Sequence, residues 1–225
     1  MALIGLIHST RLVIEPVHKV VSSQCPNVEI LHVVDEGLLR SLRKSGKITD
    51  RIVHWLAGMI RPLAEEGANL AVVTCSSLSP CVNAVRQMVP IPVLKIDEPM
   101  VEWAVTTAEK IGVVMTNPST VEPSTRLIHE VSQRLGKDVH VTIRVCQDAF
   151  LKLNAGDVQG HDAEVLAAIS ELLNDMDVVM LAQISIARVL DQLDEKMAKR
   201  VLSSLDFIAP KIQEVLSQRS EAIFA

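Results

Sequence analysis

Short apolar runs alternate with longer stretches of helical periodicity along the first half of the chain. Four runs rich in Val, Ile and Leu predict buried strands at residues 3–7, 28–34, 70–73 and 93–96. Apolar residues at helical spacing predict a helix over residues 48–66, and Ser79 before Pro80 predicts the start of another that reaches about Met88. Strands alternating with helices in this order indicate an α/β fold with parallel strands.

The second half of the sequence resembles the first. Ile4-Gly5-Leu6-Ile7 resembles Ile111-Gly112-Val113-Val114, and the strand that ends before Cys75 resembles the one that ends before Gln183. Val93-Leu94 and Val201-Leu202 form a third pair, and all three pairs are separated by 107 or 108 residues. This internal repeat predicts two pseudo-symmetric lobes, residues 1–98 with 206–225 and residues 99–205. Each lobe is expected to hold a mainly parallel four-stranded sheet flanked by helices.

Charge and composition disfavour several partners. The chain has 22 basic and 27 acidic residues and a net charge of −5, which gives no general electrostatic basis for binding nucleic acid. The aromatic side chains on which bases would stack are scarce, since aromatic residues make up only 2% of the chain and Tyr is absent. No apolar run approaches the roughly 18 residues that span a bilayer. We therefore expect a cytoplasmic protein that binds neither nucleic acid nor membranes.

Candidate chemistry lies where the predicted strands end, because ligands of parallel α/β sheets bind beyond the carboxyl ends of strands. Those positions carry His8, Ser9, Asp35, Cys75, Ser76, Ser77, Thr116, Asn117, Thr120, Asp148, Gln183 and Ser185. This set is rich in hydroxyls and poor in Lys and Arg. It suits a small carboxylate held by hydroxyls and by backbone N–H groups at helix N-termini. The glycine-rich motifs of nucleotide sites are absent from the sequence.

Among the four cysteines, Cys75 is the candidate catalytic group. It follows a buried strand and precedes a predicted helix N-terminus, an arrangement that favours a thiolate. Cys81 and Cys146 are interpreted as packed core residues, and Cys25 as incidental in the turn before Pro26. With no C-x-x-C pair in a chain of this size, we expect thiols rather than disulfides.

Other titratable residues give weaker signals. Asp35 and Asp148 follow the second predicted strand of each lobe, where they either form turns or supply acid–base groups. The seven histidines show no metal-ligand spacing, so no metal is predicted. His8 is the one histidine at the carboxyl end of a predicted strand, where we expect the first lobe to face the second.

With the repeat and Thr74-Cys75-Ser76-Ser77 together, the whole chain resembles the aspartate/glutamate/hydantoin racemase superfamily, which includes maleate isomerase and arylmalonate decarboxylase. The resemblance implies two pseudo-symmetric α/β lobes with the active site in the cleft between them. It also implies one catalytic cysteine after the third strand of each lobe, and no organic cofactor or metal in the racemases.

The resemblance assigns a role to each strand-end segment. Cys75 matches the first-lobe cysteine, and Ser76 and Ser77 match the segment that binds the substrate carboxylate. His8 and Ser9 fall where glutamate racemases carry Asp-Ser. Thr116, Asn117 and Thr120 match a Thr-rich loop of the second lobe. The sequence departs from the family at Gln183, which replaces the second cysteine, and at Ile184, which replaces the usual Thr.

These observations lead to three functional hypotheses. The first is a cofactor-independent racemase or isomerase in which the Cys75 thiolate alone transfers a proton at the carbon next to a carboxylate or carbonyl of a small substrate. The second is a decarboxylase or lyase of the arylmalonate decarboxylase type, in which one proton donor suffices. The third is a non-catalytic protein that binds small carboxylates. In each case we expect a homo-oligomer, with Gln183 and Ser185 among the residues that contact the ligand.

Overall fold

The computed structural model describes residues 1–224, which divide into two compact units. Unit 1 comprises Met1–Pro99 and the segment from Phe207 onward, and unit 2 comprises Met100–Asp206. In unit 1 the elements are, in order, β1 (Ala2–His8), η1 (Arg11–Val13), α1 (Ile14–Gln24), β2 (Val28–Val34), α2 (Glu36–Ser45), α3 (Asp50–Glu65), β3 (Leu70–Val73), η2 (Ser76–Leu78), α4 (Ser79–Val85) and β4 (Val93–Lys95).

Helix α5 (Glu98–Thr107) leads into unit 2. The elements there are β5 (Lys110–Met115), η3 (Pro118–Thr120), α6 (Val121–Leu135), β6 (His140–Val145), α7 (Gln147–Asn154), α8 (Val158–Leu172), β7 (Val178–Leu181), η4 (Ile184–Gln192), α9 (Glu195–Ala198) and β8 (Val201–Ser203). Helix α10 (Ser204–Phe224) then carries the chain back into unit 1. It contacts unit 1 through the backbone carbonyl of Ala209, which accepts a weak hydrogen bond from Cys25 Sγ. None of the helices within residues 1–224 is long and apolar enough to cross a membrane.

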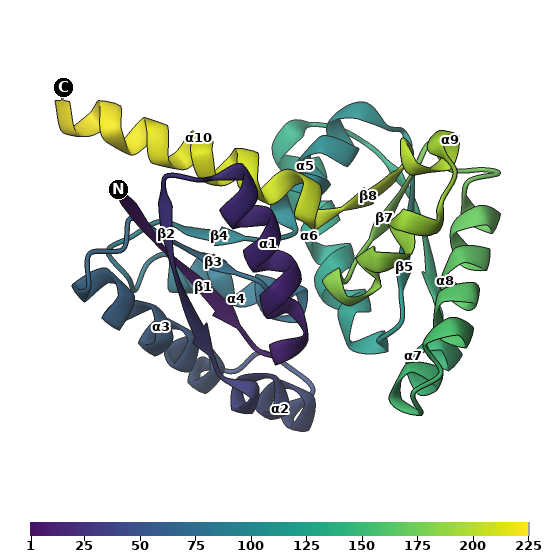
Figure 1. Ribbon diagram of the computed structural model, residues 1–225, viewed down its shortest axis with the longest axis horizontal. Helices are drawn as coiled ribbons and strands as arrows, with labels where there is room; N and C mark the ends of the chain where they lie inside the picture. Colours follow the sequence, from purple (N-terminus) through teal and green to yellow (C-terminus); the bar gives the residue numbers. More distant parts are fainter. Residues whose placement is uncertain (225) are drawn as a thin grey trace. The chain divides into compact units, whose positions relative to one another are not determined.

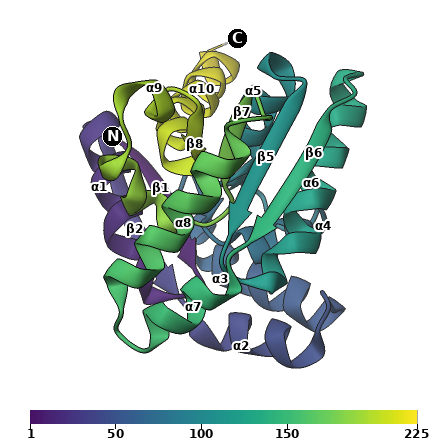
Figure 2. The ribbon, with the colours of Figure 1, turned by 90° about the vertical axis from the view of Figure 1, so that its right-hand side faces the viewer.

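Each unit holds one four-stranded sheet in which every pairing is parallel. The strand order is β2-β1-β3-β4 in unit 1 and β6-β5-β7-β8 in unit 2. Figure 1 shows α3 and α10 on opposite faces of the first sheet, and Figure 2 shows α6 and α8 on opposite faces of the second. The predicted fold class, two parallel four-stranded α/β sheets flanked by helices, is therefore confirmed.

Burial of both sheet faces explains the continuous apolar runs. The inner strands β3 and β7 are buried at every residue, whereas the edge strands β2 and β6 are mostly half-buried. Gly5 and Gly112 occupy equivalent places in the inner strands β1 and β5. A Cβ at Gly5 would collide with Leu63 of α3, and one at Gly112 would crowd Leu172 of α8. The repeated Ile-Gly motif thus lets a helix pack closely on each sheet.

Two predicted boundaries differ from the structure in ways that affect the site. The segment after Cys75 forms the single 3-10 turn η2 before α4, and α4 ends at Val85 instead of near Met88. Asp148 lies in the first turn of α7, three residues beyond the end of β6, and not directly after the strand. The predicted helix over residues 48–66 is present as α3, which Thr49 caps through a side-chain hydrogen bond to the Ile52 amide.

Candidate active site

The carboxyl ends of β1 and β3 bring Ser9 and Cys75 to the same edge of the first sheet. Ile7 pairs with Val73, and Ser9 and Cys75 each lie two residues further along. Cys75 is half-buried, so part of its surface is open, whereas Ser9 is buried. Among the described residues, Ser9 Oγ has no oxygen or nitrogen partner within hydrogen-bonding geometry, and the group that its hydroxyl influences is the neighbouring Cys75 thiol, whose pKa it lowers. A buried hydroxyl without a partner costs folding free energy. The Ser9 hydroxyl is therefore available to hydrogen-bond a ligand next to the Cys75 thiol.

The charge state of Cys75 is set by opposing effects. Burial raises the pKa of the thiol above its usual range, and the nearby Asp97 carboxyl acts in the same direction. The Ser9 hydroxyl and the backbone N–H groups of Ser77 and Leu78 lower the pKa, but burial outweighs them. The prediction of a thiolate considered the helix dipole and the nearby N–H donors, but not the desolvation of the thiol. The neutral thiol is therefore the resting form near pH 7.

His8 begins a chain of three histidines. Its Nδ1 lies 2.9 Å from Thr74 Oγ1, and its Nε2 lies 2.9 Å from His32 Nδ1. His32 Nε2 in turn lies 2.9 Å from Nδ1 of His18, which is exposed on α1. His8 itself is fully buried, and burial together with the neighbouring His32 lowers its pKa to about 4. His8 is therefore neutral at pH 7 and is held in place by ring-to-ring hydrogen bonds.

A buried carboxyl completes the edge of unit 1. Asp97 follows β4, and both of its carboxylate oxygens accept from Ser79 Oγ, at 2.8 and 3.0 Å. Burial raises the pKa of Asp97, while the Ser79 and Ser76 hydroxyls and the charge of Lys95 lower it. The sequence prediction missed Asp97, Ser79 and Lys95. The signal was present, because the fourth predicted strand ends at the same edge as the first and third.

In unit 2 the equivalent edge is closed by its own side chains. Val114 pairs with Leu181, so Thr116 and Gln183 correspond to Ser9 and Cys75. Gln183 Oε1 accepts hydrogen bonds from the Thr116 amide at 2.7 Å, the Thr116 hydroxyl at 3.1 Å and the Asn117 amide at 3.2 Å. We call this arrangement of Gln183, Thr116 and Asn117 the Gln183 clamp.

The other predicted residues of unit 2 support the loop. Asn117 Oδ1 accepts from the Ser119 amide, which caps η3. Thr120 is buried, and its hydroxyl donates to the Asn117 carbonyl at 2.6 Å. Ser185 is half-buried in η4, two residues after Gln183. These bonds fix the backbone at the end of β5.

The two candidate aspartates have different surroundings. The Asp35 carboxylate caps α2 through the Gly37 amide at 2.8 Å and accepts from Trp55 Nε1 at 2.9 Å. Asp148 is exposed on α7. Both oxygens of Asp35 thus have structural partners, and the two aspartates are not in equivalent positions.

The remaining cysteines are packed. Cys25, Cys81 and Cys146 are all buried, and burial raises the pKa of Cys81 to about 12 and that of Cys146 to about 11. Such thiols are poor nucleophiles at neutral pH. The pKa of Cys75 is also raised by burial, but Cys75 differs from these three cysteines in being partly exposed. Within residues 1–224, no group of three or more His, Cys, Asp or Glu side chains is arranged to hold a metal ion.

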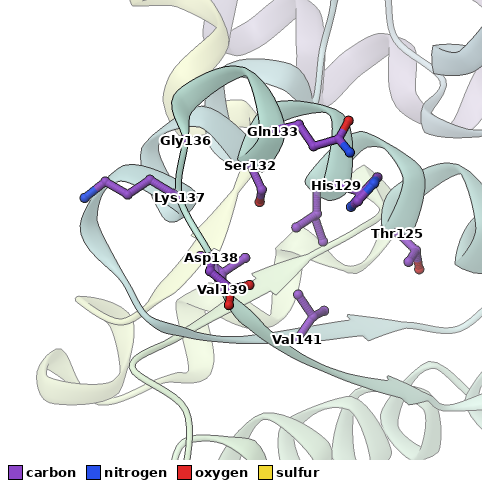
Figure 3. A pocket seen from close by; sticks show the side chains of 10 residues that line it. Thr125, His129, Ser132, Gln133, Gly136, Lys137, Asp138, Val139 and Val141 are labelled. Atoms are coloured by element: carbon purple, nitrogen blue, oxygen red, sulfur yellow. The ribbon is translucent and has the colours of Figure 1, made fainter.

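Unit 2 also has a surface hollow of about 460 Å³ away from these strand ends (Figure 3). Its walls come from α6, including His129 and Ser132, from the segment before β6, including Asp138, and from Val141 of β6. None of the candidate residues lines it.

The sequence matches the profile of the Asp/Glu/Hydantoin racemase family over residues 4–212. The chain belongs to this family. No curated protein matched the sequence significantly.

Solved structures of racemases share the fold. An aspartate racemase from Picrophilus torridus is 12% identical, covers 96% of this chain and 94% of its own, and superposes with a TM-score of 0.71. A glutamate racemase from Bacillus anthracis is 19% identical over 97% of this chain and 82% of its own, with a TM-score of 0.71. An allantoin racemase from Klebsiella pneumoniae is 17% identical over 97% and 89% of the two chains, with a TM-score of 0.70. At these identities the likeness establishes the racemase fold.

Proposed function

We propose that this chain is a cofactor-independent isomerase of the racemase family that exchanges a proton at a carbon next to a carboxylate or carbonyl. The observation that carries the proposal is the pairing of the half-buried Cys75 with the unpartnered Ser9 hydroxyl at one sheet edge. A thiol supplies the transferable proton, and an unused donor stabilises charge that develops on the substrate oxygen.

Cys75 rests as a neutral thiol, because burial raises its pKa, and it must first lose this proton to water before the thiolate can remove the proton of the substrate carbon. When the thiol acts as the acid, the S–H bond breaks as a C–H bond forms on the substrate, and a thiolate remains. Interactions with the backbone N–H groups of Ser77 and Leu78 stabilise that thiolate. In the reverse direction the thiolate removes the proton, and the electron pair of the C–H bond moves into an enediolate-like oxygen.

A decarboxylase or lyase is the second candidate, and two observations favour it. The resting thiol is already protonated, and the equivalent residue of unit 2, Gln183, has no proton that it can exchange near neutral pH. In that reaction the carbon–carboxylate bond breaks, CO2 leaves, and the electron pair left on carbon takes the thiol proton. The Cys75 thiolate then recovers a proton from water.

A substrate screen in D2O separates these functions. Small chiral carboxylates, hydantoins and malonates are incubated with the protein, and deuterium uptake at carbon is followed by NMR together with CO2 release. The isomerase predicts uptake without CO2, whereas the decarboxylase predicts CO2 with one deuterium retained in the product. A protein that binds these compounds but catalyses neither reaction would contradict both proposals and would favour the non-catalytic binder.

Alkylation tests whether an active compound from the screen binds at Cys75. Iodoacetamide should modify Cys75 before the buried cysteines, and an active compound from the screen should slow that modification. If the compound leaves the alkylation rate unchanged, the site of reaction is not at Cys75.

A further inference from the structure

The side-chain amide of Gln183 is held in one orientation. Two backbone N–H groups and one hydroxyl, from Thr116 and Asn117, donate to it, so the oxygen must face them. The Nε2 group therefore points away from these donors. Gln183 is half-buried, and its side-chain hydrogen bonds within residues 1–224 are all made by Oε1 and none by Nε2.

The Gln183 clamp also uses up the donors of its loop. A carbonyl oxygen has two lone pairs, and three donors already converge on Gln183 Oε1. The amides of Thr116 and Asn117 are the donors that a ligand carboxylate would otherwise take at this edge. They are satisfied from within the protein, so among these two backbone amides and the Gln183 side chain, the donors left free are the two N–H bonds of Nε2.

We propose that Gln183 Nε2 is the recognition group of unit 2, and that it binds an acceptor oxygen of the ligand, a carbonyl or a carboxylate. Thr116 and Asn117 act as positioning residues that orient this donor, instead of contacting the ligand themselves. The inference rests on the proposed function, which supplies a ligand with such an oxygen. It makes Gln183 a determinant of specificity: a ligand without an acceptor at this place leaves a half-buried donor unpaired.

The orientation is tested first, without a ligand. Hydrogen exchange of the Thr116 and Asn117 amides is measured by 15N NMR in the wild type and in Gln183→Ala. We expect both amides to exchange at least about tenfold faster in the variant, because their common acceptor is gone. Gly112 and Val114, whose amides lie within β5, are the internal reference. Equal exchange rates in the two proteins would overturn the clamp.

Recognition is tested with malonate and hydantoin as probes. Their binding should shift the side-chain NH2 signals of Gln183 in a saturable way, and those signals are assigned by their loss in Gln183→Glu. The Glu variant keeps an oxygen for the three donors but presents a second oxygen outward. We expect it to bind malonate at least about tenfold more weakly than the wild type.

Thr106→Val is the matched control, because it removes one hydroxyl hydrogen bond of unit 2, to the Glu102 carbonyl on α5, and leaves the Gln183 clamp intact. We expect its malonate affinity to stay within about threefold of the wild type. The recognition role is wrong if Gln183→Glu binds malonate as well as the wild type does, or if the probes shift other signals but not those of Gln183. If neither probe shifts any signal, the ligand class of the proposed function fails as well, while the exchange rates still decide on the clamp.

Discussion

The residue two positions after the third strand is Cys75 in unit 1 and Gln183 in unit 2. This difference changes the hydrogen bonds made by the residue that follows the neighbouring strand, Ser9 in unit 1 and Thr116 in unit 2. In unit 1 the short Cys75 side chain stands opposite Ser9, whose hydroxyl has no partner. In unit 2 the longer Gln183 reaches across and engages the hydroxyl and amide of Thr116, the residue equivalent to Ser9. The same fold thus leaves a hydroxyl beside a thiol at the edge of unit 1, whereas at the edge of unit 2 the backbone amides are satisfied by a side-chain oxygen.

The two units also differ in the titratable groups at their strand ends. Unit 1 gathers groups that can carry a proton, namely Cys75, Asp97 and the three-histidine chain that starts at His8. At the equivalent strand ends, unit 2 offers amides and hydroxyls. The groups that can carry a proton therefore lie at the strand ends of unit 1.

The largest effect is expected from Cys75→Ser. Replacing the thiol by a hydroxyl of much higher pKa should lower turnover of an active substrate by about 10²- to 10⁴-fold. Cys25→Ser is the matched control, since a hydroxyl there can still donate to the Ala209 carbonyl. Steady-state rates and urea unfolding of both variants check this. Full activity in Cys75→Ser would place the chemistry outside this thiol.

Burial of His8 should appear as a pH dependence of stability. The pKa of His8 is about 4 in the folded protein, against 6.5 for an unperturbed imidazole in the unfolded chain. The unfolded chain therefore binds a proton that the folded protein does not, so stability is lost as the pH falls from about 6.5 towards 4. The free energy of unfolding should fall by up to about 3 kcal/mol over that range from this residue alone.

The measurement is the urea-unfolding free energy of the wild type and of His8→Asn at pH 7, 6 and 5. We expect a shallower decline in the variant, whatever its stability at pH 7. Parallel curves for the two proteins would show that His8 is not held neutral by burial.

Gln183→Cys tests whether a second thiol restores acid–base chemistry to unit 2. It places a thiol at the position equivalent to Cys75, and it removes the Gln183 clamp. If racemisation is limited by the lack of a second acid–base group, the variant should racemise an active substrate at least about tenfold faster than the wild type. Polarimetry on both enantiomers measures this. A slower variant would mean that the amide contributes more than a second thiol can supply.

The smallest effects come from a matched pair of hydroxyl deletions. Thr116→Val removes a hydrogen bond to Gln183 and should cost about 0.5–1.5 kcal/mol of stability. Ser9→Ala removes a buried hydroxyl without a partner, so stability should stay unchanged or rise. The order should reverse for activity: Ser9→Ala should lose more activity than Thr116→Val does. A stability loss in Ser9→Ala as large as in Thr116→Val would remove the contrast between the two edges.

Much of the fold was predictable because it depends on local pattern. The strand runs, the helix over α3 and the repeated Ile-Gly motif follow from burial on both sheet faces, which the sequence displays directly. Asp97 was also within reach, since it follows a predicted strand. The charge state of Cys75 was not, because desolvation depends on packing that periodicity does not reveal.

Contacts between distant segments could not be predicted. His18, His32 and His8 come from a helix, an edge strand and an inner strand, and no sequence spacing links them. The role of Gln183 depends on how far its side chain reaches towards a loop 66 residues away. The sequence identified the replacement of cysteine at this position, but not the use of its oxygen.

The most direct test of one-sided proton chemistry compares two rates in D2O for the wild-type protein. An active chiral substrate is supplied as each pure enantiomer, and deuterium uptake at carbon and loss of configuration are followed together. Because Cys75 has a transferable proton and Gln183 does not, we expect one enantiomer to gain deuterium with retained configuration at least about tenfold faster than it racemises. Equal, efficient rates of exchange and racemisation from both enantiomers would contradict the account and require a second acid–base group.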